Sequence, residues 1–151
     1  MAKAGERPGS ALVTAMGGNG VEVGIQLGAM PGRWFVAPAE PPVGTLIEGF
    51  ADQDRLGAIG DSALVDAIGF GSMLTAETSG QENGALFPIR HPAFTRHPTA
   101  VGLSASRVVG TSRAPTVALG ILDKSGRRGR IGGGIYAPPQ ALFAEACANV
   151  L

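Results

Sequence analysis

A period-two apolar pattern on both sides of one turn constrains the fold most strongly. Val21–Leu27 alternates apolar with small or polar side chains, which is typical of a half-buried β-strand. Met30–Gly32 follows, with proline and glycine at positions that suit a turn. Arg33–Ala37 then returns the chain as a second strand. The sequence therefore predicts a β-hairpin over residues 21–37.

A second hairpin is predicted near the C-terminus. Thr116–Leu122 is typical of a buried strand, Asp123–Gly126 of a turn and Arg130–Tyr136 of the returning strand. Glycines 132–134 leave that strand little side-chain packing and favour close approach of another backbone. We expect a ligand or a subunit there, so Gly133 is a candidate substrate-binding residue.

Helical patterns occupy the remaining ordered segments. The most prominent is Gly60–Gly71, where Asp61 or Ser62 is a suitable N-cap and apolar residues recur at helical spacing. Gly69 and Gly71 each cost about 1 kcal/mol relative to alanine inside a helix. Another backbone or a ligand is therefore expected to pack closely against this helix. Shorter helices are expected at 11–16, capped by Ser10, at 104–109, and at 140–150 after a proline pair.

Strands and helices are mixed along the chain, so the predicted class is α+β. We expect a single compact domain, residues 1–151, of β-hairpins packed with a few short helices. Thr45–Phe50 is a further candidate strand. Residues 79–98 are rich in glycine, proline and polar side chains, and a loop of this length is often functional.

Charge and cysteine content exclude several classes of function. The chain has 12 Lys+Arg and 12 Asp+Glu, hence no net charge, which argues against nucleic-acid binding and an electrostatic membrane anchor. No apolar run approaches the ~20 residues of a membrane span. Cys147 is the single cysteine, so an internal disulfide is impossible and a cytoplasmic location is expected. Its apolar helix favours a buried structural thiol.

Arg33 and Trp34 are candidate substrate-binding residues at the start of a strand. An arginine there can bind a carboxylate or phosphate through two parallel hydrogen bonds, with Trp34 as a wall of the site. A solvated strand end is the alternative for Arg33, and the two interpretations are evenly balanced. For Trp34 the favoured interpretation is that its side chain is buried in the hydrophobic core.

Asp61 and Ser62 are candidate catalytic residues at a helix start. Free N–H groups at such a position attract anions, but the Asp61 carboxylate would repel one. A neutral or amide-bearing group therefore suits this position better. Plain capping of the helix is the favoured alternative.

Two basic segments carry less specific signals. His91 and His97 share an arginine-containing loop that could gather at an anion. No carboxylate or cysteine lies near them, so no metal site is predicted. Residues 123–130 form a basic hairpin tip that lacks both the order of a phosphate-binding loop and interleaved aromatic residues. The favoured interpretation is an exposed turn. Binding of a phosphate by Lys124 or Arg130 is the alternative.

Several sequence blocks occur in the order of a known family. The specific ones are Gly32–Ala39, with Arg-Trp-Phe, and Gly60–Ala63, with Gly-Asp-Ser. Supporting blocks are Asn19–Ile25, Gly69–Gly71, Pro98–Val109 and Arg130–Ile135 with Pro138. Over most of its length the chain thus resembles one domain of the YlbE-like family, a component associated with oxamate carbamoyltransferase in purine (allantoin) degradation.

The resemblance implies carbamoyl or amide chemistry on a small carboxylated substrate, within an assembly of several subunits. No cofactor is expected. It implies that Arg33 holds the substrate carboxylate and that Asp61 and Ser62 hydrogen-bond the amide. Arg107 would neutralise a second anionic group.

The chain also departs from the family. Family members are about three times as long, with further domains before this one, and this chain is shortened after Leu74. Ser104 stands where the family has an acidic residue. Ala118–Gly120 and Asp123 stand where Asn-Thr-Gly and a histidine are expected. Lost polar groups at a strand end indicate either lost chemistry or a changed substrate.

Two functions are therefore expected. The first is a small enzyme acting on a carbamoyl, amide or related small carboxylated substrate. The alternative is a non-catalytic assembly or interaction domain that has lost its catalytic polar residues. A homo-oligomer or a partner subunit fits both, because the surface has little charge and many glycines. A nucleotide or phosphate binder using residues 124–130 is a third and weaker hypothesis.

Overall fold

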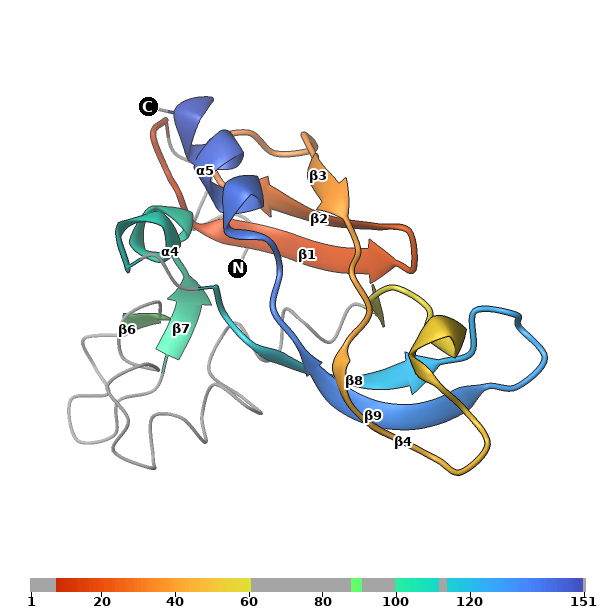
Figure 1. The fold of residues 1–151 in the computed structure, drawn as a ribbon. Coiled ribbons are helices and arrows are strands. Elements are labelled where there is room, and N and C mark those ends of the chain that lie inside the picture. The colour runs from red at the N-terminus through yellow and green to blue at the C-terminus, as the bar shows by residue number, and fades with distance from the viewer. Residues whose placement is uncertain (1–7, 61–87, 91–99, 112–113, 151) are drawn as a thin grey trace.

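The computed structural model describes residues 8–60, 88–90, 100–111 and 114–150. Figure 1 shows the arrangement of its strands and helices. The strands in these residues are β1 (Val13–Asn19), β2 (Glu22–Leu27), β3 (Phe35–Pro38), β4 (Val43–Leu46), β5 (Ile59–Gly60), β6 (Pro88–Arg90), β7 (Ala100–Leu103), β8 (Val117–Leu122) and β9 (Arg130–Tyr136). The helices are the short 3-10 turn η1 (Asp52–Asp54), α4 (Ala105–Thr111) and α5 (Gln140–Ala148).

The first sheet has the strand order β3-β2-β1-β5, and each neighbouring pair is antiparallel. The hairpin predicted for residues 21–37 is confirmed as β2 and β3. Ile25 pairs with Phe35, and both side chains are buried. Gly32 has φ +82° in the connecting turn, a conformation that glycine adopts without strain.

The helix predicted for residues 11–16 is wrong, because this segment enters strand β1. Gly17 and Gly18, which suggested a helix end, lie inside the strand and pair with Gly24 and Val23 of β2. Strand pairing with a sequence neighbour therefore outweighs the helix preference of alanine, leucine and methionine.

The second sheet has the order β4-β9-β8 and is also antiparallel. The hairpin predicted over residues 116–136 is confirmed as β8 and β9, whereas the candidate strand at 45–50 begins earlier, as β4. A Cβ added to Gly132 or Gly134 would collide with the backbone carbonyls of Thr45 or Val43 in β4. At these two glycines the close backbone approach is therefore made by β4 of the same chain, not by a ligand or a subunit.

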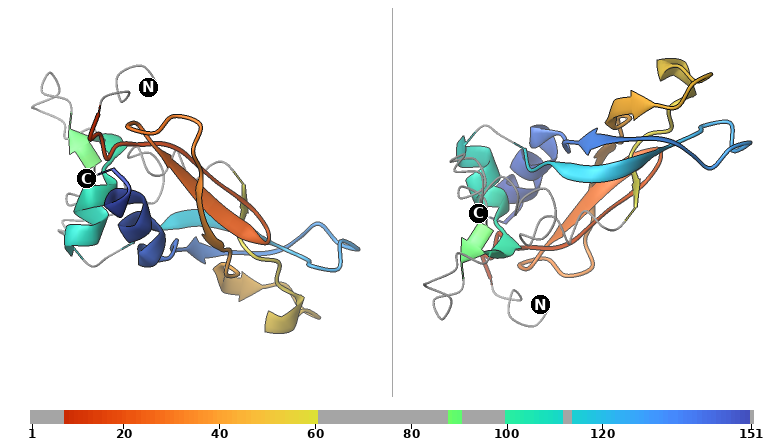
Figure 2. Two further views of the ribbon diagram at one scale, coloured as in Figure 1. Left: turned by 90° about the horizontal axis from the view of Figure 1, so that it is seen from above. Right: turned by 90° about the horizontal axis from the view of Figure 1, so that it is seen from below.

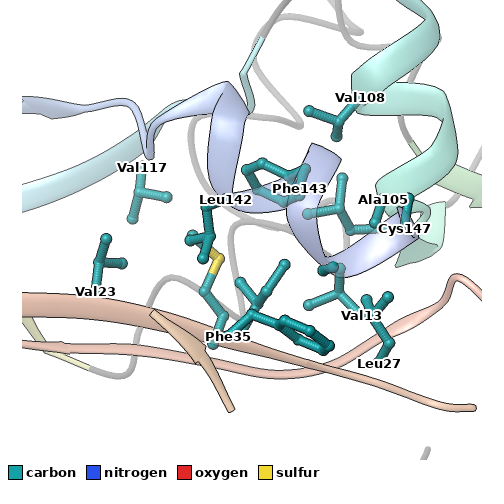
Figure 3. Packing of buried hydrophobic residues seen from close by; sticks show 14 of the residues in the cluster. Val13, Val23, Leu27, Phe35, Ala105, Val108, Val117, Leu142, Phe143 and Cys147 are labelled. Carbon is teal, nitrogen blue, oxygen red and sulfur yellow. The ribbon is translucent and has the colours of Figure 1, made fainter. Parts of the chain in front are cut away.

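Helices α4 and α5 match the predictions at 104–109 and 140–150. Both lie at one end of the molecule, and the hairpin tip between β8 and β9 lies at the other (Figure 2). No helix in the described part of the chain is long and apolar enough to cross a bilayer. Leu142 and Phe143 of α5 point toward Val13, Val23 and Phe35 of the first sheet (Figure 3). The core thus lies between this sheet, α4, α5 and the inner face of β8 and β9.

Antiparallel sheets with a few short helices confirm the predicted α+β class. Gly60 belongs to β5 and pairs with Gly18 of β1. The predicted helix after it, residues 61–71, lies outside the described residues. The single-domain organisation remains a prediction.

Candidate functional site

The outer face of the first sheet carries an open groove of about 460 Å³. Its residues come from the neighbouring strands β1, β2 and β3 and from the position just before β3. They are Gly17, Gly18, Asn19, Glu22, Gly24, Trp34 and Val36. Glycines provide a flat floor, while an indole and a valine provide an apolar wall.

Trp34 lies on this outer face, so its predicted place in the core is wrong. The side chain is 50% exposed, whereas its neighbour Phe35 is buried. The reason is strand alternation, because successive side chains point to opposite faces of a sheet. A Cβ on Gly24 would lie 2.9 Å from Cε3 of Trp34 and 3.3 Å from Cγ1 of Val36. Glycine at position 24 therefore lets the indole lie close to the strand backbone.

Two polar side chains border the groove beside the turn after β1. Oδ1 of Asn19 accepts hydrogen bonds from the backbone N–H groups of Val21 (2.9 Å) and Glu22 (2.7 Å). This closes the turn and leaves the side-chain NH₂ of Asn19 as its remaining hydrogen-bonding group. The Glu22 side chain is exposed and supplies a carboxylate. Sequence reasoning missed Glu22 and Asn19 as site residues, although both lie in a block shared with the family.

Arg33 contacts a different part of the molecule from Trp34. Its guanidinium carbon lies 4.8 Å from the centre of the Phe35 ring, and Nη2 donates a hydrogen bond of 2.8 Å to Oδ1 of Asn149. The indole of Trp34 instead lies against Gly24. The two residues therefore do not form one pocket among the described residues, and Trp34 is not a wall beside the Arg33 guanidinium.

The other predicted site residues are dispersed. Arg107 lies on α4 and is exposed. Gly133 lies on β9 in the second sheet, where a Cβ would come within 2.9 Å of Nη2 of Arg130. Asp61 and Ser62, like His91 and His97, lie outside the described residues.

The hairpin tip at residues 124–130 is exposed, as favoured from the sequence. Asp123 is buried at its base and accepts hydrogen bonds from the Ser125 hydroxyl (2.7 Å), the Ser125 N–H (2.9 Å) and the Arg128 N–H (3.0 Å). The Ser125 side chain and backbone are the main cause of a lowered pKa for Asp123. This carboxylate therefore orders the tip, a role that the sequence did not indicate.

Tyr136 places a hydroxyl between the two sheets. The residue is 4% exposed, and its hydroxyl oxygen has no hydrogen-bond partner in the described part of the chain. Burial, assisted by the charge of Glu40, raises the pKa of Tyr136 to about 12. The adjoining cavity, bordered by Gly18 and Gly60, has about 10 Å³ and is limited to about one water molecule.

Cys147 is buried in α5, which confirms a structural thiol. Burial raises its pKa, so the thiolate needed for nucleophilic chemistry is disfavoured.

Comparisons with known proteins agree with the sequence-based resemblance. Residues 1–62 match the family model described as oxamate carbamoyltransferase subunit AllG. The chain is 30% identical over 162 aligned residues to the oxamate carbamoyltransferase subunit AllG of Escherichia coli K12, covering 93% of this chain and 38% of that protein. It is also 30% identical to the uncharacterized protein YahG of the same organism, covering 91% of this chain and 34% of that protein.

A solved structure has the same fold. The crystal structure of a conserved protein of unknown function from Enterococcus faecalis V583 superposes with a TM-score of 0.81. The match covers 93% of this chain and 39% of the Enterococcus faecalis chain, at 24% sequence identity. This similarity supports the fold alone.

The chain spans about a third of the length of the curated relatives it matches. The expectation that relatives are longer is therefore confirmed. The YlbE-like designation itself is not confirmed by these matches. The matches establish that this chain is similar to part of AllG, with the family-model match confined to residues 1–62.

Proposed function

We propose that this chain is a component of an enzyme that transfers or processes a carbamoyl or amide group on a small carboxylated substrate. One observation carries the proposal. Every residue that lines the groove on the first sheet lies within residues 1–62, the segment that matches the AllG family model. The groove is thus the part of the described surface most directly connected to that similarity.

The chemistry of the groove suits a planar neutral amide better than a bare anion. The exposed face of Trp34 can stack on a planar group. The Glu22 carboxylate accepts hydrogen bonds from amide N–H groups and repels anions. The Asn19 NH₂ group offers a donor for a carbonyl oxygen. These residues would bind and orient the amide end of the substrate.

The carboxylate end needs a cation, and the described lining of the groove contains none. Arg33 remains the proposed carboxylate ligand for a site outside the groove; its guanidinium has five donors, of which Nη2 bonds Oδ1 of Asn149 and Nη1 contacts Sδ of Met30 at 3.7 Å. It lies away from Trp34, so a small substrate in the groove would need a different cation. We propose that a partner subunit supplies it, because the similar AllG protein is described as a subunit.

Asp61 and Ser62 remain the proposed catalytic residues. They follow Gly60 directly in the sequence, and Gly60 pairs with Gly18 of the groove floor. Arg107 and Gly133 remain predicted substrate-binding residues without a described contact to the groove.

The sole tryptophan gives a direct test of groove occupancy. Oxamate and small amides should change Trp34 fluorescence in a saturable way, on this chain and on any complex it forms. Glu22→Gln should weaken that binding about tenfold, which corresponds to about 1.4 kcal/mol, while Glu48→Gln at another exposed site should not. Loss of binding in Arg33→Ala but not in Glu22→Gln would move the site to Arg33. No saturable change would overturn the ligand groove.

A second function is favoured by the apolar character of the same face. Trp34 and Val36 are large hydrophobic residues that are about half exposed. Contact with a partner protein would cover them, as in a non-catalytic assembly domain. In that case Val36→Asp should abolish partner binding, and small molecules should leave Trp34 fluorescence unchanged.

A further inference from the structure

The outer face of the second sheet has a distinct apolar row. Val43 of β4 pairs with Ile135 of β9, and their side chains are 80% and 53% exposed. The two strands lie side by side in Figure 1. A groove of about 440 Å³ follows this row, bordered also by Glu40 and Pro41. Exposed apolar pairs on a sheet face are typical of contact surfaces.

A cation lies farther along the same face. Gly133 shares this face with Ile135, because the two are separated by two positions on one strand. The side chain of Arg130 lies over Gly133 and Gly120, and its Nε donates a hydrogen bond of 2.8 Å to the carbonyl of Gly132. A residue larger than glycine at position 120 or 133 would displace the Arg130 side chain. The guanidinium is therefore held flat on the sheet with further N–H groups available.

The charges on this face are arranged with opposite signs at opposite ends. Glu40 precedes Val43 and borders the groove at one end, whereas the Arg130 guanidinium lies over Gly133, two residues or about 7 Å from Ile135 along β9. The Val43–Ile135 pair therefore lies between the two charges. Neither forms an ion pair within the described residues. A two-fold rotation about an axis between them brings each Glu40 onto the other copy's Arg130 and packs the apolar rows together. Such self-complementarity is what a two-fold interface requires.

Addition of a strand at the β4 edge is blocked by the chain itself. Arg55 donates hydrogen bonds to the carbonyls of Pro42 (2.8 Å) and Gly44 (2.9 Å), which point away from β9. An extended partner strand would have to displace this guanidinium. Contact is therefore favoured through the face of the sheet and not through its edge.

We propose that this face binds a second copy of the same chain, with Glu40 of each copy paired to Arg130 of the other across the Val43–Ile135 rows. The exposed apolar part of this face consists of two side chains, Val43 and Ile135, whereas a standard interface contains roughly 20–30 residues on each partner. The dimer is therefore weak, with a dissociation constant on the order of 10 µM.

Sedimentation velocity on the full chain, from well below to well above about 10 µM, tests the proposal. A reversible monomer–dimer equilibrium is expected. Glu40→Lys and Arg130→Glu should each raise the dissociation constant about tenfold or more, because each creates two like-charge contacts. Val43→Lys should have a similar effect. Glu145→Lys and Val21→Lys, at exposed sites on other surfaces, are the matched controls.

Mixing the two charge variants identifies the partner unambiguously. A heterodimer of Glu40→Lys with Arg130→Glu restores both opposite-charge contacts, so the mixture should associate about as well as the wild type. The double variant in one chain should do the same. A monomer at every concentration would overturn the proposal, and so would a dimer that neither variant weakens. Thermal melting of each variant shows that the monomers remain folded.

Discussion

Arg33 and Asn149 lie 116 positions apart in the sequence and are joined by a 2.8 Å hydrogen bond from Nη2 to Oδ1. This bond connects the turn between β2 and β3 to the end of α5. The guanidinium also lies over the ring of Phe35. The predicted carboxylate ligand is therefore held at the place where the first hairpin meets the last helix.

We expect Arg33→Ala to lower the free energy of unfolding by about 1–2 kcal/mol, because it removes this hydrogen bond and the cation–π contact. Asn149→Ala should cost about 0.5–1 kcal/mol. The double variant should lose less than the sum, since both single changes remove the same bond. Urea unfolding of the four proteins gives the coupling energy. Strictly additive losses would show that the bond does not contribute in solution.

Gly24 should be intolerant of a side chain because the indole of Trp34 occupies the space. Gly24→Ala places a Cβ 2.9 Å from Cε3 of Trp34, so the indole must move toward solvent. We expect a red-shifted fluorescence spectrum and a loss of about 1–3 kcal/mol in unfolding free energy. Gly17→Ala is the matched control on the same face, because its Cβ would meet only the Gly60 carbonyl at 3.6 Å. Equal spectra in the two variants would contradict this packing.

The single tyrosine allows a specific pH prediction. The pKa of Tyr136 is raised from 10.0 to about 12 in the folded chain. The unfolded chain therefore loses the phenol proton first, and stability that is complete below pH 10 should fall as the pH rises toward 12. Two pKa units correspond to about 2–3 kcal/mol.

Urea unfolding at about pH 9 and pH 11, with the phenolate absorbance followed in parallel, should show about half of this loss, on the order of 1.3 kcal/mol. Tyr136→Phe should show a smaller pH dependence over the same range. It should also be about as stable as the wild type at neutral pH, because the buried hydroxyl has no partner among the described residues. A large loss at neutral pH would instead indicate that a water molecule in the adjoining cavity completes its hydrogen bonding.

The elements predicted correctly from the sequence are those in which an apolar strand pattern is followed directly by residues typical of a turn. Val21–Leu27 combines period-two alternation with the turn residues Met30–Gly32. The second hairpin combines the apolar run Thr116–Leu122 with the turn residues Asp123–Gly126. Residues 11–16 failed because their local preference is helical, while the neighbouring hairpin supplies a strand to pair with. The local preference of these residues and their pairing in the sheet disagree. A short stretch of sequence shows the local preference but does not show which strand it will pair with.

The groove was only partly predictable for a related reason. Trp34 was identified, but its large apolar surface favoured the core over the exposed face. Strand alternation relative to Phe35 was the available signal, and it outweighs residue type. Glu22 and Asn19 form part of the groove only through the order β3-β2-β1, which no local pattern specifies.

Arg55 should prove important for keeping the molecule soluble. Its guanidinium bonds the outward carbonyls of Pro42, just before β4, and of Gly44 within β4, and Nε bonds Oδ1 of Asp52 at 2.8 Å. Arg55→Ala leaves both carbonyls to water or to another chain, so we expect a loss of about 1–3 kcal/mol in unfolding free energy and faster aggregation on mild heating. Arg55→Lys retains the charge but cannot form all three bonds with one planar group, so it should rescue only part of the loss. Light scattering during a thermal ramp measures the aggregation temperature. Arg127→Ala, at the exposed hairpin tip, is the control for a general effect of lost charge. Aggregation of both variants at the same temperature would contradict a specific role of Arg55 at the edge of the sheet.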